Sequence, residues 1–302
     1  IEIREKFLDS LSSIKPHDLK DIVNVGEAIN DFDSILDYDF SKNVSTGFNA
    51  LDRMIGGLQP SGLYAIAGVP AAGKTTFILN MIHNVLKDNK KVLFASFEMS
   101  YREVINRFVS MITGLSTVAM RGANRRTYTL EDKTLKTIAA AKEKIKKYDL
   151  NFIGKGGLSV SDIADRMKYL GGVQVLFVDY LQLIKSAGKT RYEQVTQISR
   201  DLKMLAMQFD IPVVVVASIN RANMARPDKR PQLSDFRDSG NIEYDLDGAF
   251  LLYRPAQFKA DANETEAELD IAKNRFGKSN VVMTMEWHPE IASFTNMEKR
   301  GF

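Results

Sequence analysis

Continuous apolar segments alternate along this chain with longer segments in which apolar residues recur every three or four positions. The continuous segments are short, as is typical of strands buried on both faces. They predict strands over residues 62–67, 91–97, 150–153, 174–178 and 211–217. The periodic segments predict helices over residues 77–86, 100–112, 130–148, 159–170 and 191–209. This alternation predicts an α/β fold with a mainly parallel central sheet flanked by helices.

The two ends of the chain depart from this alternation. Toward the C-terminus, strand patterns with few helices between them occupy residues 248–253, 268–273 and 280–287. They predict that the sheet finishes with antiparallel strands. Before residue 44, apolar positions at helical spacing predict amphipathic helices over residues 1–15 and 18–36. We therefore expect a helical linker segment at residues 1–43 and one large α/β domain at residues 44–302.

Composition narrows the classes of protein to which the chain can belong. Its 302 residues include no cysteine, which excludes disulfides, a thiolate nucleophile and a cysteine-ligated zinc site. No apolar run approaches the roughly 20 residues of a membrane span, so we expect no membrane partner and a cytoplasmic location. The 41 basic and 38 acidic residues leave a net charge of +3, too nearly balanced to indicate a nucleic-acid partner by itself.

A glycine-rich segment between the first predicted strand and the helix after it has the pattern G-x-x-x-x-G-K-T. Its glycines let backbone N–H groups curl around a triphosphate, and the helix N-terminus adds partial positive charge. Lys74 would reach the β- and γ-phosphates, and the Thr75 hydroxyl would ligate Mg²⁺. A chance glycine-rich turn is the alternative, but the strand, the spacing, the Lys-Thr pair and the helix all favour a phosphate-binding loop. The residues expected at the nucleotide are Gly68, Ala71, Ala72, Gly73, Lys74, Thr75 and Thr76.

Two carboxylates end other predicted strands. Asp179 follows the apolar strand at residues 174–178, where it could support the metal of a Mg²⁺·nucleotide site or cap the next turn. Glu98 follows the strand at residues 91–97, where it could activate the attacking water or serve as a helix N-terminal charge beside Ser100. Because open α/β sheets build their sites at strand carboxyl ends, we favour the metal and catalytic roles.

These motifs, in their order, resemble the ATPase domain of the DnaB-type replicative DNA helicases, hexameric RecA-fold motors of bacteria and their phages. Two strings discriminate best, Asp179-Tyr-Leu-Gln-Leu and Ser239-Gly-Asn-Ile-Glu-Tyr-Asp-Leu-Asp247. The resemblance covers about residues 44–294. The other matching strings are Ser45-Thr-Gly-Phe-Asn-Ala-Leu-Asp, Gly56-Gly-Leu-Gln-Pro, Gly68–Thr75, Phe97-Glu-Met-Ser, Ile198-Ser-Arg-Asp-Leu-Lys, Asn220-Arg and Ala272-Lys-Asn-Arg-Phe-Gly.

The resemblance implies a role for each matching residue. Glu98 corresponds to the catalytic glutamate and Asp179 to the Mg²⁺-supporting aspartate. Arg275 corresponds to the arginine finger that reaches the nucleotide of the adjacent subunit, assisted by Lys273. The pore-facing residues implied are Arg237, Asp238 and Gly240 on one loop and Lys185, Lys189 and Arg191 on another.

The chain departs from the family pattern at one position of the site. The family usually has Ser-Gln-Leu-Asn-Arg where this chain has Ala217-Ser-Ile-Asn-Arg, so Ser218 stands at the place of the Gln thought to sense the γ-phosphate. Either a neighbouring residue takes over that sensing, or hydrolysis couples less tightly to movement. The family's N-terminal helical domain, which docks primase, is also missing, and residues 1–43 resemble the linker that packs on the next subunit.

The function implied is an ATP- and Mg²⁺-dependent motor that moves 5′ to 3′ on single-stranded DNA as a homo-hexameric ring and unwinds the duplex. Primase and a helicase loader are expected partners of a full-length protein, in a bacterial cell or a phage-infected host. Two alternatives remain open from the sequence. One is a RecA/RadA-like recombinase ATPase, and the other is an ATP-dependent DNA-binding assembly module that does not translocate.

Overall fold

In this computed structural model, the described strands form one nine-stranded sheet in the order β3-β2-β4-β5-β1-β6-β7-β8-β9. The structure describes residues 24–30, 40–120, 131–154, 156–220, 225–236 and 242–296. The chain divides into two compact units, residues 1–41 and 42–302, and the sheet belongs to the second. In the first unit, helix α2 (Val25–Asn30) lies within the predicted helix at 18–36. The predicted helix at 1–15 lies outside the described residues.

The parallel part of the sheet contains six strands, and the antiparallel part adds three. Strands β1 to β6 pair in parallel, and β7, β8 and β9 continue the sheet in antiparallel pairs. The strands are β1 (Leu63–Gly68), β2 (Val92–Ser96), β3 (Leu150–Ile153), β4 (Val175–Asp179), β5 (Val213–Ser218), β6 (Gly248–Tyr253), β7 (Glu266–Asn274), β8 (Val281–His288) and β9 (Ser293–Asn296). The predicted mainly parallel sheet with an antiparallel end is confirmed. Two details differ: β6 runs parallel to β1, and the sequence did not predict β9.

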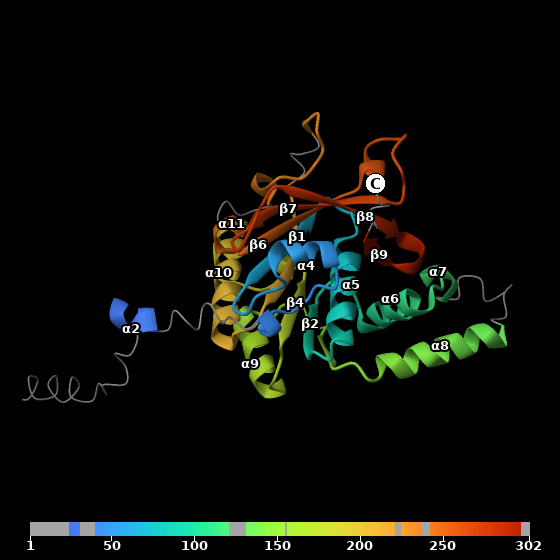
Figure 1. Ribbon diagram of the computed structural model, residues 1–302, viewed down its shortest axis with the longest axis horizontal. Helices are drawn as coiled ribbons and strands as arrows, with labels where there is room; N and C mark the ends of the chain where they lie inside the picture. The colour runs from blue at the N-terminus through green and yellow to red at the C-terminus, as the bar shows by residue number, and fades with distance from the viewer. Residues whose placement is uncertain are drawn as a thin grey trace, which may run out of the picture. The chain divides into compact units, whose positions relative to one another are not determined.

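Helices flank the sheet and begin where polar side chains can cap them. Ser100, Ser159 and Thr190 each form a capping box with a carboxylate three residues later, which fixes the starts of α6, α9 and α10. Helices α6 and α8 lie side by side, as do α9 and α10 (Figure 1). The α-helices of this unit are α4 (Asn49–Ile55), α5 (Lys74–Lys87), α6 (Tyr101–Thr113), α7 (Thr117–Met120), α8 (Asp132–Ile145), α9 (Val160–Leu170), α10 (Arg191–Phe209) and α11 (Ile242–Asp245). The 3₁₀ turns are η2 (Phe40–Lys42), η3 (Leu181–Leu183), η5 (Leu233–Asp235), η6 (Pro255–Gln257) and η7 (Pro289–Ile291).

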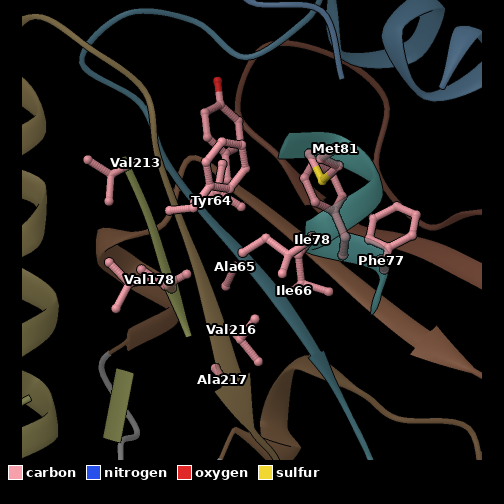
Figure 2. Close-up of a cluster of buried hydrophobic side chains, with 14 of the residues drawn as sticks. Tyr64, Ala65, Ile66, Phe77, Ile78, Met81, Val178, Val213, Val216 and Ala217 are labelled. Carbon is pink, nitrogen blue, oxygen red and sulfur yellow. The ribbon is translucent and has the colours of Figure 1, made fainter. Parts of the chain in front are cut away.

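The hydrophobic core surrounds β1, whose six residues are all buried. Ile78 of α5 lies beside Ile66 of β1, with Phe77 and Met81 on the same helix (Figure 2). On the neighbouring strand β5, five of the six residues are buried, which explains why the sequence shows unbroken apolar runs instead of alternation. Burial on both faces of these strands fixes the sheet, and with it the positions of the strand ends.

Helix α4 lies in a stretch whose composition predicts turns. The Asp52 carboxylate accepts hydrogen bonds from Ser45 Oγ (2.7 Å), from the Thr46 N–H (2.9 Å) and from Thr46 Oγ1 (2.8 Å). These bonds fold residues 45–48 back onto the helix, which ends at Gly56 in the left-handed conformation (φ +72°). The string Ser45-Thr-Gly-Phe-Asn-Ala-Leu-Asp is therefore a structural turn, and Leu51 and Ile55 of α4 join the core.

The C-terminal strand β9 is joined to α5 by one side chain. The Asn80 amide donates to the Ala292 carbonyl (3.1 Å) and accepts from the Phe294 N–H (3.1 Å). The Phe294 ring meets the Phe77 ring edge-on at 5.6 Å and lies 4.4 Å from the Trp287 ring. Asn80 thereby supplies the hydrogen bonds that the end of the sheet needs, and β9 closes against the helix that begins at Lys74.

Candidate nucleotide-binding site

The site is built by the register of the parallel strands. Gly68 at the end of β1 pairs with Ser218 at the end of β5, and Ser96 of β2 pairs with Asp179 of β4. Glu98 follows two residues after Ser96. Because parallel strands all end at the same edge of the sheet, these residues surround one cleft of about 580 Å³.

Most of the predicted nucleotide residues line this cleft. They are Ala71, Gly73, Lys74, Thr75, Thr76, Glu98, Asp179 and Ser218. Gly68 and Ala72 were also predicted to bind the nucleotide, but they do not line the cleft. Ala72 is fully buried within the loop, and the Gly68 carbonyl oxygen accepts a hydrogen bond from Lys74 Nζ. The structure therefore brings the phosphate-loop residues and both strand-end carboxylates together, as the sequence predicts.

The loop conformation depends on two glycines. A Cβ at Gly68 would lie 2.5 Å from the Leu252 carbonyl oxygen, so only glycine lets β1 approach β6 this closely. Gly73 has φ +100°, and a Cβ there would also lie 2.9 Å from the Phe294 ring. The loop therefore lies tightly between the end of β6 and the aromatic rings of the last strands, and these contacts restrict its backbone conformation.

Lys74 begins α5, and its side chain folds back over the loop. Its Nζ donates to the carbonyl oxygens of Gly68 and Val69, each at 3.0 Å. Burial lowers the pKa of Lys74 from its usual value, while the nearby carboxylates of Asp179 and Glu98 oppose that shift. An anion in the cleft would favour the charged ammonium in the same way that the carboxylates do.

Asp179 is the most deeply placed charged group of the site. Its side chain is fully buried, and neither carboxylate oxygen has a hydrogen-bond partner within the part of the chain that the structure describes. Burial raises the pKa of Asp179 from 3.8 to about 6, while the Thr75 hydroxyl is the largest influence in the opposite direction. It does not cap the next turn, since η3 has Tyr180 at its N-cap position.

These oxygens fit a hard divalent cation. A buried carboxylate without a partner beside a threonine hydroxyl is the kind of donor set that Mg²⁺ takes from proteins. Within the described residues, no three His, Asp or Glu side chains cluster as a metal cage. A Mg²⁺ ion held here would therefore keep water and phosphate oxygens as its remaining ligands, which is its habit at nucleotide sites.

Asp179→Asn should stabilise the ligand-free protein at neutral pH. The folded-state pKa of about 6 lies above the unfolded value of 3.8, so the wild-type chain loses stability relative to the Asn variant as pH rises through this interval. In chelator, urea unfolding at pH 8 should give the Asn variant a free energy of unfolding higher by roughly 2–3 kcal/mol, and the difference should vanish near pH 4.

Asp162→Asn is the matched control for that measurement. Hydrogen bonds from the Ser159 backbone and hydroxyl lower the pKa of Asp162, the opposite direction to Asp179. Its substitution should not stabilise the chain at pH 8. Equal unfolding curves for wild-type and Asp179→Asn protein at pH 8 would contradict the conclusion that burial disfavours the charged form of Asp179.

Arg107 is a site residue that the sequence analysis missed. It projects from α6 into the cleft, and its Nη1 donates to the Thr76 hydroxyl at 2.7 Å. Its charge also lowers the pKa of Asp179. No local motif marks it, because a helix of alternating polar and apolar positions gives an arginine no special signal. The other lining residues not predicted are Pro70, Thr117, Tyr180, Val216, Trp287, Pro289 and Ala292.

Ser218 lines the cleft at the end of β5. Its backbone N–H donates to Gln182 Oε1 (3.3 Å), and Gln182 Nε2 donates to its carbonyl oxygen (3.5 Å). The buried Gln182 carboxamide is thus engaged with the backbone of β5 and does not line the cleft. The side chain that this strand end presents to the cleft is the short hydroxyl of Ser218.

The two predicted catalytic cations lie elsewhere in the subunit. Arg275 follows β7, and its backbone N–H donates to the carbonyl oxygen of Asp247, just before β6 begins. Asp247 in turn pairs with Leu63 at the start of β1, whereas the phosphate loop follows Gly68 at the end of that strand. A strand rises about 3.3 Å per residue, so roughly 16 Å of sheet separates Arg275 from the cleft in the same chain. Lys273 lies near Arg275 and donates to the Glu243 carbonyl oxygen.

The predicted DNA-contacting residues are only partly described. Lys185 and Lys189 are exposed on the segment that joins η3 to α10, and Arg191 is exposed at the first position of α10. Arg191 donates to the Gln182 carbonyl and to Gln194 Oε1, which ties the start of α10 to η3. The predicted pore-loop residues Arg237, Asp238 and Gly240 lie outside the described residues.

Comparison with known proteins places this geometry in a family. The profile of the DnaB-like helicase C-terminal domain matches residues 43–296, which include the whole cleft and the strand that carries Lys273. The chain belongs to the DnaB-like helicase family. The family's C-terminal domain thus accounts for the nucleotide cleft and for the mostly parallel sheet.

Curated DnaB-like relatives share about a third of their residues with this chain. The replicative DNA helicase DnaB of Geobacillus stearothermophilus is 34% identical over 265 residues, covering 85% of this chain and 57% of the relative. The probable plasmid replicative DNA helicase of Chlamydia psittaci is 33% identical over 245 residues, covering 79% and 53%. The chain therefore spans just over half the length of the relatives it matches.

Solved structures agree with the family assignment. A DnaB-like replicative helicase studied with primase matches with a TM-score of 0.82 and 29% identity, covering 92% of this chain and 68% of that chain. A separately solved ATPase domain also gives 0.82, at 30% identity, over 92% of this chain and all of that one. The RadB recombinase, with a TM-score of 0.54 and 16% identity, shares the fold alone. Within the described part of the chain, no helix is long and apolar enough to cross a membrane.

Proposed function

We propose that this chain is the ATP-driven motor domain of a replicative DNA helicase that assembles as a hexameric ring on single-stranded DNA. One observation carries the proposal. The cleft contains a phosphate loop and the carboxylates of Asp179 and Glu98, while the cations that would complete a hydrolytic site lie at the opposite edge of the same sheet. A second subunit must therefore supply them.

Within one subunit, each cleft residue has a definite task toward ATP and Mg²⁺. The phosphate loop and the N-terminus of α5 would bind the phosphates, and Lys74 would exchange its contacts with two carbonyls for phosphate oxygens. Thr75 and Asp179 would hold Mg²⁺, which supplies charge neutralisation between the phosphates. Glu98 would orient and deprotonate the attacking water. Ser218 would contact the γ-phosphate side of the cleft through its hydroxyl.

The neighbouring subunit would complete the electrostatic clamp. Arg275, whose side chain is 52% exposed, can present its guanidinium to a second chain. Lys273 is partly buried, and its pKa is lowered by burial and by Arg275. It would assist Arg275 at the phosphates of the neighbouring subunit. Charge that develops on the transferring phosphoryl group would be stabilised only where two subunits meet.

DNA would be held through its backbone in the centre of the ring. Arg237, Asp238 and Gly240 are the proposed contacts on one loop, and Lys185, Lys189 and Arg191 are those on the other. Contacts to phosphate carry no base information, so binding should be sequence-tolerant and sensitive to salt. We place this activity in the cytoplasm, moving 5′ to 3′ as the family does.

The segment at residues 1–43 is the proposed linker to the next subunit, and residues 44–302 form the RecA-like ATPase domain. Primase and a helicase loader are proposed partners of the full-length protein. The recombinase alternative has weaker support, because its structural likeness extends to the fold alone.

The proposed motor is tested by ATP turnover and strand displacement. With Mg²⁺, single-stranded DNA should raise the turnover rate several-fold, and a forked duplex with a 5′ tail should be unwound. The stimulation should be equal for unrelated DNA sequences and should fall with added salt. An ATP turnover rate that does not change when DNA is added would instead favour the DNA-binding assembly module that does not translocate.

A further inference from the structure

Asp247 forms the centre of a buried ion cluster at the amino-terminal edge of the sheet. Its side chain is 1% exposed, and its two oxygens take different partners. Oδ1 accepts from Arg275 Nη1 at 2.7 Å, and Oδ2 accepts from Lys203 Nζ at 2.7 Å and from the Leu63 N–H at 2.8 Å. The carboxylate is thus hydrogen-bonded from three sides, to β1, to α10 and to the residue after β7.

Asp247 holds Arg275 twice, through its backbone carbonyl and through its carboxylate. The Arg275 N–H donates to the Asp247 carbonyl oxygen at 2.8 Å, in addition to the side-chain bond. Lys203 is anchored independently, since its Nζ also donates to the Ser61 carbonyl at 2.8 Å. The position of Asp247 is therefore set by β1 and α10, and it does not follow movements of Arg275.

Arg275 shares the Asp247 carboxylate with Lys203, so this carboxylate alone does not neutralise the guanidinium. Lys273 and the carboxylates of Glu243 and Asp245 belong to the same charged surroundings. A guanidinium has five N–H donors, and the bond to Asp247 uses one of its arms. About half of the Arg275 side chain is exposed, so a second chain can reach it.

We propose that Asp247 is a positioning residue for Arg275: held by Lys203 and by the start of β1, it aims the guanidinium outward toward the phosphates bound by the adjacent subunit. This inference rests on the proposed function. The gain is one of preorganisation, because a long side chain that is already oriented loses less rotamer freedom when it meets the phosphate.

The test separates the subunit that gives Arg275 from the subunit that hydrolyses ATP. Donor chains carry Glu98→Gln, which binds nucleotide without turnover, and recipient chains carry Arg275→Ala with an intact cleft. Each should be inactive alone, and a mixture should recover turnover at the shared sites. Donors that also carry Asp247→Asn should recover a turnover number about tenfold lower, with an unchanged KM for ATP.

The readout is a fall in turnover number at an unchanged KM for ATP. A merely structural role of Asp247 would not produce this change, since the recipient cleft is not mutated. Donors with Glu268→Gln are the matched control, because this change also breaks an ion pair of β7, the one with Arg230, without touching Arg275. They should restore turnover as well as the parent donors do. Equal turnover with Asp247→Asn donors would overturn the inference.

Lys203→Met keeps the test decisive where Asp247→Asn donors fail to fold. The carboxylate would then be left to Arg275 alone, and the neutral pair should present less charge to the phosphate, so turnover should again fall severalfold. Unchanged turnover with these donors would likewise overturn the inference. If the parent donors recover no turnover, the shared site itself fails, and with it the proposed function.

Discussion

Arg275→Ala should lower ATP turnover by about 10³-fold or more while leaving nucleotide binding intact. An arginine that reaches a transferring phosphoryl group contributes on this scale because it meets charge that develops only in the transition state. Arg275 lies at the far edge of the sheet from its own cleft, so its loss removes nothing that holds ATP in the same subunit. Turnover is measured across a series of protein concentrations, with and without single-stranded DNA.

Nucleotide binding can be followed in the same samples by intrinsic fluorescence. The chain has a single tryptophan, and Trp287 lines the nucleotide cleft. Lys278→Ala is the matched control, since Lys278 is an exposed cation in the same turn and lies three residues from Arg275. It should turn over ATP as the parent chain does. A specific activity independent of protein concentration and of Arg275 would mean that each subunit hydrolyses ATP by itself.

Glu98→Gln should reduce turnover by roughly 10²- to 10⁴-fold with little change in the affinity for ATP. The amide has the same shape as the carboxylate but cannot take a proton from water. The alternative role, a charge at the start of α6, belongs to another residue: the Ser100 N–H and hydroxyl are paired with Glu103. Glu98 instead lines the cleft beside Asp179 and Lys74. Single-turnover hydrolysis with prebound ATP isolates the chemical step.

Glu103→Gln provides the control for that measurement. It removes a carboxylate from the same segment and weakens the capping box of α6, which should lower stability slightly and leave turnover unchanged. If Glu103→Gln slows hydrolysis as much as Glu98→Gln does, the loss must come from disorder at the start of α6. In that case Glu98 would not be the base.

The sheet and the phosphate loop were predictable because their signals are local. Unbroken apolar runs such as residues 213–217 indicate strands buried on both faces. The spacing from Gly68 to Lys74, between a strand and a helix, is typical of a phosphate-binding loop. Because parallel strands end at the same edge of the sheet, the sequence also predicts that Asp179 and Glu98 lie close together. The strands, the phosphate loop and the strand-end carboxylates are each recognisable in a segment of a few residues, so their prediction does not depend on distant contacts.

The remaining features depend on contacts between distant segments. Helix α4 forms because Asp52 organises the turn before it, although the composition of that stretch favours turns. Strand β9 (Ser-Phe-Thr-Asn) has only one apolar residue, so it shows no apolar run, and it is held by the side chain of Asn80. Arg107 and Asp247 acquire their roles from the register of elements far apart in sequence. Local periodicity does not predict contacts between residues so far apart in the sequence.

The link between Asn80 and β9 also sets an order of events during synthesis. Asn80 and Phe294 are 214 positions apart, and the phosphate loop rests against the Phe294 ring through Gly73. A ribosome makes the phosphate loop early, at a rate of about 5–20 residues per second. Roughly ten seconds or more must then pass before the strand that holds it leaves the ribosome. The growing chain therefore carries its nucleotide-binding motif in an unfinished form, and the cleft becomes complete only when nearly all of this domain has been translated.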